Sequence, residues 1–306
     1  MTLLSITNSL GGGSRVFLEE FGRVVSIHPL ECPNVNDFIG YDTSSITGIF
    51  INQLYLYVRR PKEYLARLRH LFPHLPFSVC LHDFYLLLGT LLTSQEGLEH
   101  ELCRLEGDPK EREYRREVFH HFTHILCPSY FVRDTLLRIF PELRERCEVR
   151  YHRHIDLTHS VPIHQKPRGV GDPLQLLCFG DFRVKGKGAE VALRVAQTYS
   201  KKIQLHVMGH HMYGDKEKEA FASCTGPYTD TSLLKEIQKR DPHAILFVNT
   251  VPETFCYAMH TAIESRRPII APAIGSFPEM LQGRPHTYLY HNNIDDILYQ
   301  HYGPTH

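Results

Sequence analysis

Residues 252–279 read PETFCYAMHTAIESRRPIIAPAIGSFPE, and they carry the strongest indication of the fold. It follows an apolar run at residues 244–248 and predicts a polar loop, a helix, a strand and a second turn that contains a glycine. A helix that begins near residues 252–255 exposes backbone N–H groups and the positive end of its dipole, which together bind phosphate well. Because Glu253 adds a carboxylate at the same edge, the pattern indicates a pocket for a sugar joined to a diphosphate.

Apolar runs alternate with helical segments through the first half of the chain. We expect its strands at residues 3–7, 24–27, 48–51, 77–81, 125–127 and 149–152. We expect its helices at residues 14–21, 55–72, 110–122 and 130–140. Ser129 is typical of a helix N-cap, and Pro61 should lie in a first turn or mark a break. Strands separated by helices at this spacing predict parallel βαβ units.

The second half repeats this alternation after a linker at residues 158–172, which combines prolines and glycines and lacks periodicity. We therefore place two domains at residues 1–160 and 161–306. Strands are expected at residues 174–179, 203–208 and 244–248, and helices at 189–199 and 233–239. Two doubly wound α/β domains would bind ligands at the carboxyl ends of their strands.

Composition narrows the class of protein. A length of 306 residues favours two domains, and 34 basic against 34 acidic residues disfavour a nucleic-acid partner. The eight cysteines are scattered without a C-x-x-C pair, as expected for reduced thiols. No apolar run approaches the ~20 residues that span a bilayer, and the chain starts directly on a strand. These features predict a cytoplasmic protein.

Residues 252–279 resemble the donor-site segment of the retaining glycosyltransferases of family 4, in which P-E-x-F-G precedes a helix with a second glutamate. Other segments in matching order are ITNSLGGGSRVFLEEF (6–21), VCLHDFY (79–85), CPSYFVRDTLL (127–137), FGDFRVKGKGAEVAL (179–193) and TGPYTDTSLL (225–234). The resemblance implies a GT-B fold, in which two Rossmann-like domains face each other across a cleft. It also implies transfer of a sugar from a nucleotide-diphosphate sugar to a hydroxyl of a glycan or lipid-linked glycan, as in bacterial surface-polysaccharide assembly, with no further cofactor.

The resemblance assigns the donor site to residues around the loop that begins the helix. Glu253 would face the donor sugar as a catalytic residue. The phosphates would meet the backbone N–H groups of Thr254, Phe255, Cys256 and Tyr257. Cys256 stands where the family has glycine, and it is small enough to allow close approach.

The second glutamate of the family, which holds the ribose, falls on Thr261. Glu264 lies one helical turn further on and could take over this contact. Alternatively, Glu264 is a surface residue beside Arg266 and Arg267. This departure puts nucleotide affinity in question more than the fold.

Further donor-binding residues are assigned in the glycine-containing loops. Arg183 and Lys187 would neutralise the leaving diphosphate, although the family's arginine position falls on Asp181 and a solvated basic loop is the alternative. Gly12 and Gly13 would let the backbone approach the donor, or would only form a tight turn. Tyr228 belongs to the G-x-Y segment that precedes the donor loop.

Histidines offer a second catalytic candidate. By resemblance His82 contacts the donor sugar, while Asp83 orients its imidazole or touches the acceptor. His120 and His124 could share a helix face at metal-like spacing, but no further ligand completes a site, so we predict no metal.

Residues 55–77 interleave aromatic, basic and leucine residues. Such a helix can lie on the inner face of an anionic membrane, or it can pack on its own domain. The short C-terminal segment also suggests one module of a larger synthase. Two alternatives to a transferase remain: a non-catalytic protein that binds nucleotide sugars or glycans, and a nucleotide-sugar epimerase of the same fold.

Overall fold

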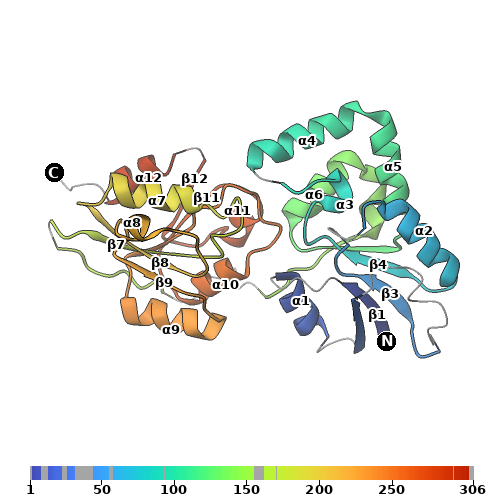
Figure 1. The fold of residues 1–306 in the computed structure, drawn as a ribbon, viewed down its shortest axis with the longest axis horizontal. Coiled ribbons are helices and arrows are strands. Elements are labelled where there is room, and N and C mark those ends of the chain that lie inside the picture. The colour runs from blue at the N-terminus through green and yellow to red at the C-terminus, as the bar shows by residue number, and fades with distance from the viewer. Residues whose placement is uncertain are drawn as a thin grey trace. The chain divides into compact units, whose positions relative to one another are not determined.

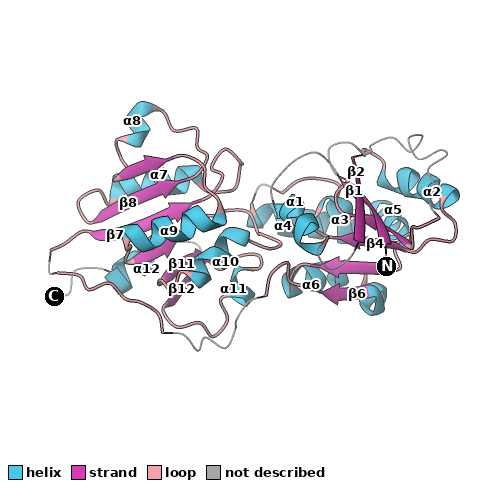
Figure 2. Cartoon of the chain, turned by 90° about the horizontal axis from the view of Figure 1, so that it is seen from below, coloured by secondary structure: helices cyan, strands magenta, loops and turns pink. Residues whose placement is uncertain are grey.

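The computed structural model describes residues 2–7, 13–22, 26–31, 44–54, 58–92, 94–154, 162–169, 171–291 and 293–302. The chain forms two compact units, each with its own parallel sheet of six strands (Figures 1 and 2). Unit 1 comprises Met1–Leu92 and Glu96–His152, and unit 2 comprises Thr93–Gln95 and Arg153–His306. The domain boundary predicted between residues 160 and 161 lies outside the described residues.

The sheet of unit 1 has the order β2-β1-β3-β4-β5-β6. Its strands are β1 (Thr2–Thr7), β2 (Ser26–Glu31), β3 (Gly48–Ile51), β4 (Phe77–Cys80), β5 (His124–Cys127) and β6 (Cys147–Val149). Strand β3 is buried along its whole length, as expected for a parallel strand covered on both faces. Two predicted strands have other bounds. The strand predicted at 24–27 corresponds to β2, which begins at Ser26, with residues 24 and 25 outside the described part, and the one predicted at 149–152 ends already at Val149.

Helices of unit 1 begin and end where local signals indicate. They are α1 (Gly13–Phe21), α2 (Pro61–Leu71), α3 (Tyr85–Leu88), α4 (Gln95–Gly107), α5 (Pro109–His120), α6 (Tyr130–Ile139) and the 3-10 helix η2 (Pro141–Arg146). Pro61 opens α2, and Ser129 Oγ caps α6 by accepting from Val132 N at 3.2 Å. The prediction that α2 extends back to residue 55 is wrong, because residues 58–60 are not helical; residues 55–57 lie outside the described part.

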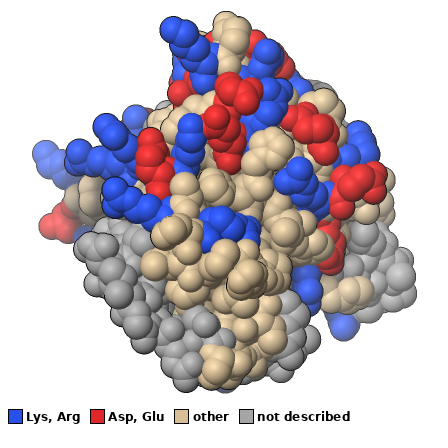
Figure 3. Space-filling model, turned by 90° about the vertical axis from the view of Figure 1, so that its right-hand side faces the viewer, with Lys and Arg blue, Asp and Glu red and all other residues tan. Residues whose placement is uncertain are grey.

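The apolar side of α2 packs on unit 1 itself. Leu65 and Leu68 are fully buried, and Tyr64 is nearly so. On the face shown in Figure 3, blue basic and red acidic side chains are interspersed. Lys62 of α2 pairs with Glu117 of α5. The leucine stripe that suggested a membrane contact is therefore occupied by the core.

Unit 2 has the sheet order β12-β11-β10-β7-β8-β9. Its strands are β7 (Leu174–Phe179), β8 (Ile203–Met208), β9 (Ser223–Thr225), β10 (Ala244–Leu246), β11 (Ile269–Pro272) and β12 (Thr287–Tyr290). Its helices are α7 (Ala189–Thr198), α8 (Asp215–Lys218), α9 (Asp230–Arg240), α10 (Tyr257–Glu264), α11 (Phe277–Met280) and α12 (Ile294–Tyr302). In Figure 1, α7 and α12 cover one face of this sheet and α9 the other.

This strand order is that of a Rossmann domain, with β7 and β10 as the two central strands. The chain order reverses between them, so the loops at their carboxyl ends diverge and leave room for a ligand. The elements that were not predicted from the sequence, among those the structure describes, are α3, α4, η2, α8, β9, α11, β12 and α12.

Candidate functional site

In unit 2, three loops meet at the carboxyl ends of the adjacent strands β7, β10 and β11. Thr250 N donates to Gly186 O at 2.8 Å, which ties the loop after β10 to the loop after β7. Ser276 N donates to Glu253 O at 2.9 Å, which adds the loop after β11. These bonds fix the predicted donor loop in place at the point where the strand order reverses.

Glu253 is held on two sides within these loops. Its Oε1 accepts from Asn249 Nδ2 at 2.6 Å and from the Lys187 ammonium, and its side chain is only 15% exposed. Burial lowers the pKa of Lys187, but attraction to Glu253, Cys256 and Asp181, together with the hydrogen bond to Glu253, leaves the pKa raised. The structure thus brings two predicted site residues together as an ion pair. It adds Asn249, which the sequence reasoning missed.

Two glycines permit this close packing. A Cβ on Gly188, whose φ is 82°, would lie 1.8 Å from Val248 O. A Cβ on Gly275, whose φ is 60°, would lie 2.5 Å from Glu253 N. Both positions therefore require a residue without a side chain, so the loop that carries Glu253 has one shape.

Arg183 is already paired within its own loop. Its Nη2 lies 2.6 Å from Asp181 Oδ2 and its Nε 2.8 Å from Oδ1. These hydrogen bonds raise the pKa of Arg183 and lower that of Asp181. The aspartate at the family's arginine position thus partly cancels the charge of the arginine two residues on.

Helix α10 begins at Tyr257, later than the sequence predicts. Cys256 is its N-cap, and Cys256 Sγ accepts from Met259 N at 3.4 Å. Burial raises the pKa of this thiol to about 12, so it caps the helix as a neutral group. Thr254 and Phe255 lie in the loop before the helix rather than in its first turn.

The two candidates for the ribose contact differ sharply in exposure. Thr261 is fully buried, and its Oγ1 lies 3.5 Å from Tyr257 O within α10. Glu264 is 52% exposed, and its Oε1 lies 3.6 Å from His260 Nδ1. Of the two side chains, only Glu264 is available to solvent.

Tyr228 is half-buried and packs edge-on against Phe179, with ring centroids 5.9 Å apart. Burial raises the pKa of its phenol. Among the remaining candidates, Gly13 is the first residue of α1, and Gly12 lies outside the described residues.

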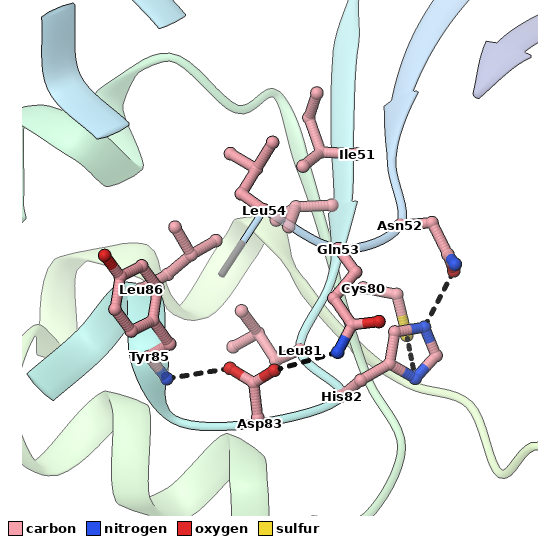
Figure 4. Close-up of a pocket in the computed structure, with 11 residues that line it drawn as sticks. Ile51, Asn52, Gln53, Leu54, Cys80, Leu81, His82, Asp83, Tyr85 and Leu86 are labelled. Atoms are coloured by element: carbon pink, nitrogen blue, oxygen red, sulfur yellow. Dashed lines mark hydrogen bonds between the residues drawn. The ribbon is translucent and has the colours of Figure 1, made fainter. Parts of the chain in front are cut away.

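In unit 1, a chain of polar side chains follows the carboxyl edge of the sheet. Asn52 Nδ2 donates to Thr7 Oγ1 at 3.1 Å, and Asn52 Oδ1 lies 2.8 Å from His82 Nε2 (Figure 4). Burial lowers the pKa of His82 to about 3, so its ring is neutral. Asn52, which the sequence reasoning missed, therefore sets the orientation of the predicted catalytic histidine.

Asp83 does not orient the imidazole, which was one of its two predicted roles. Its Oδ1 accepts from Tyr85 N at 2.8 Å at the start of α3, and its Oδ2 lies 3.5 Å from Gln53 Nε2 (Figure 4). Burial raises the pKa of Asp83, while these two hydrogen bonds oppose the rise.

The second histidine pair is not arranged as the sequence suggested. Helix α5 ends at His120, whereas His124 opens strand β5 and lies 2.8 Å from Glu148 Oε2. The two histidines therefore do not share a helix face.

Comparison with known proteins identifies the fold. No family model and no curated protein sequence matches the chain. Among solved structures, the lipopolysaccharide outer core galactosyltransferase WaaB aligns with a TM-score of 0.63 and 14% identity, over 97% of this chain and 88% of WaaB. Anabaena HepE in complex with UDP-glucose aligns with a TM-score of 0.62 and 12% identity, over 95% of this chain and 85% of HepE. Sucrose-phosphate synthase from Thermosynechococcus elongatus aligns with a TM-score of 0.62 and 13% identity, over 97% of this chain and 87% of the synthase.

These structures are glycosyltransferases of the GT-B type, and the predicted GT-B fold with two parallel-sheet α/β domains is confirmed. At such low identity the likeness concerns the fold alone. The chemistry of this chain has to be argued from its own residues.

Proposed function

We propose that this chain is a retaining glycosyltransferase of the family 4 type. It would move a sugar from a nucleotide-diphosphate sugar to a hydroxyl of a glycan or lipid-linked glycan. The observation that carries the proposal is the ion pair of Lys187 and Glu253 in unit 2, held where the strand order reverses. The fold supports it, because HepE of the same fold has been solved with UDP-glucose.

The residues of this pair suit the two halves of such a donor. Negative charge grows on the diphosphate as the glycosidic bond breaks, and a fixed cation near that charge lowers the barrier. Lys187 supplies the cation, and Glu253, oriented by Asn249, would accept hydrogen bonds from sugar hydroxyls. The acceptor hydroxyl would attack from the face that the diphosphate leaves, with retention of configuration.

His82 would act on the donor sugar and Asp83 on the acceptor side, as the resemblance implies. The ring of His82 is neutral, and Asn52 and His152 engage its two nitrogens, so a sugar hydroxyl would have to displace one of these contacts. Asp83, already fixed by Tyr85 and Gln53, would present a rigid acceptor.

A panel of nucleotide sugars tests the proposal. A ligand that binds only the folded state raises the melting temperature, so the matching nucleotide sugar should stabilise the protein. With the acceptor present, NMR of the product should show the anomeric configuration of the donor. Stabilisation by no member of the panel would contradict the proposal, and an inverted product would contradict retention.

A non-catalytic protein that binds nucleotide sugars is the second candidate. The pairing of Arg183 with Asp181 and the burial of Thr261 favour it, because both reduce the groups available to a donor. The two candidates differ in turnover: the enzyme releases nucleoside diphosphate in the presence of the stabilising sugar nucleotide, and the binding protein does not.

The proposed setting is the cytoplasmic side of a membrane, where lipid-linked acceptors and a larger synthase could be reached. Among the described residues, no helix is both long enough and apolar enough to cross a bilayer. Since Leu65 and Leu68 of α2 are buried, we expect any membrane contact of residues 55–77 to rest mainly on basic side chains and to weaken in high salt. Sedimentation with anionic and neutral vesicles measures this contact.

A further inference from the structure

Three side chains with metal-binding atoms converge at the carboxyl edge of the unit 1 sheet. His82 Nδ1 lies 3.1 Å from His152 Nε2 and 3.9 Å from Cys80 Sγ. All three atoms lie within 4.8 Å of one another, and this is the one such cluster in the part of the chain that the structure describes. Figure 4 shows the sulfur of Cys80 facing the ring of His82.

The sheet explains the convergence. Cys80 ends β4 and His82 follows two residues later, so both can face the same side of the chain. His152 follows β6, which ends at the same edge because all strands of the sheet are parallel. Residues 70 positions apart are thereby brought into contact.

Hydrogen bonds fix which nitrogen of His82 faces the cluster. The amide of Asn52 donates to Thr7 Oγ1 and thus turns its oxygen toward His82 Nε2. An amide oxygen only accepts, so His82 Nε2 carries the proton and His82 Nδ1 presents its lone pair to the cluster. A histidine that binds a metal through one nitrogen usually donates its other N–H to such an acceptor.

We propose that Cys80 Sγ, His82 Nδ1 and His152 Nε2 bind one Zn²⁺ ion, with water in a fourth position. Tetrahedral zinc with Zn–N of about 2.0–2.1 Å and Zn–S of about 2.3 Å requires N···N near ~3.3 Å and S···N near ~3.6 Å. The two distances from His82 Nδ1, 3.1 Å and 3.9 Å, lie close to these values. On binding, the thiol releases its proton to solvent. His152 Nε2, which donates to His82 Nδ1 without the metal, gives up its proton, and His152 takes one up on Nδ1.

The side chains around Cys80, His82 and His152 hold the three proposed ligands close together. Phe17 packs on both imidazoles, with ring centroids 5.1 Å from His82 and 4.4 Å from His152, and Cys80 is 4% exposed. Three ligands that are already close lose little freedom when the metal binds.

The test uses the full chain, stripped of metal by a chelator and then titrated with Zn²⁺ and with Co²⁺. One equivalent should bind, and the cobalt form should show a thiolate-to-metal charge-transfer band. Cys80→Ser should remove this band and weaken zinc binding at least tenfold. His152→Gln should weaken zinc binding while keeping the band, since the sulfur ligand remains.

The matched control is Cys224→Ser, which removes a partly buried thiol in unit 2. It should bind zinc and show the cobalt band as the unchanged protein does, and circular dichroism should show that all variants are folded. A cobalt band that survives in Cys80→Ser, or an unchanged protein that binds no zinc, would overturn the proposal. The readout is metal content, so it stands apart from the outcome for sugar transfer.

Discussion

In each unit, polar groups lie at the carboxyl edge of the parallel sheet, but the groups of the two units differ in charge. In unit 1 the edge is a neutral chain of Thr7, Asn52 and His82, and burial keeps the imidazole uncharged. In unit 2 the edge holds the ion pair of Lys187 and Glu253, in which attraction to the carboxylate helps to raise the pKa of Lys187. In both units the parallel strands place polar groups at the carboxyl edge of the sheet, and burial and ion pairing determine whether these groups are charged. The charged groups of unit 2 suit a diphosphate, whereas the neutral groups of unit 1 suit a sugar hydroxyl or a zinc ion.

The largest effect is expected at the charged edge from Glu253→Gln. The variant keeps the size of the side chain but removes the charge that should face the donor sugar. Loss of one such contact typically lowers a rate by roughly 10²–10³. Sugar transfer and thermal melting should be measured together, with the exposed Glu219→Gln as control. Turnover of Glu253→Gln equal to that of the unchanged protein would remove Glu253 from the site.

Lys187→Ala and Arg183→Ala separate the two cations of the same loop. Both should weaken binding of a nucleoside diphosphate, and the double variant more. Both cations are paired, but Lys187 should matter more, because its side chain is less exposed than that of Arg183, 31% against 48%. A charged hydrogen bond contributes about 1.5–3 kcal/mol, so Lys187→Ala should lower affinity roughly tenfold or more. Calorimetry with the diphosphate and the neutral nucleoside checks this, and unchanged diphosphate affinity in both variants would make the loop a solvated surface.

Gly275→Ala tests whether the shape of the charged edge matters. The new Cβ would lie 2.5 Å from Glu253 N, at a backbone φ of 60°. Strain of this kind costs about 1–3 kcal/mol, so the melting temperature and the nucleotide affinity should both fall. Gly226→Ala is the control, since nothing lies within 4 Å of its added Cβ. Equal melting temperatures for the two variants would show that the loop adapts.

The smallest expected effect concerns the ribose. Glu264→Ala should cost a ribonucleotide roughly tenfold more affinity than the matching 2′-deoxynucleotide, because only the former offers both hydroxyls. Equal losses would place Glu264 outside the site. Restoring the family's glutamate through Thr261→Glu should fail, since residue 261 is fully buried and a carboxylate there would be unpaired.

Local signals in the sequence predicted much of the fold. Ser129 and Pro61 open helices as expected because capping and proline geometry act over a few residues. The strands around the two edges were found because fully buried parallel strands are continuous apolar runs. The pairing of Lys187 with Glu253 follows from the adjacency of β7 and β10, which a Rossmann order implies.

Other features depend on contacts that no local pattern reveals. Asn52 and His152 lie 30 and 70 residues from the histidine that they contact. Helix α10 starts late because a buried cysteine caps it, and cysteine is not a typical capping residue. The burial of Thr261 depends on how α10 packs, which helical spacing alone leaves undecided.

The most direct measurement of the central claim is release of nucleoside diphosphate from a panel of nucleotide sugars, with Glu253→Gln beside the unchanged protein. We expect the unchanged chain to turn over the nucleotide sugar that stabilises it, and Glu253→Gln to bind this compound but to release diphosphate roughly 10²–10³ times more slowly. Binding without release in the unchanged protein, or equal release in the two proteins, would contradict a transferase site at Lys187 and Glu253.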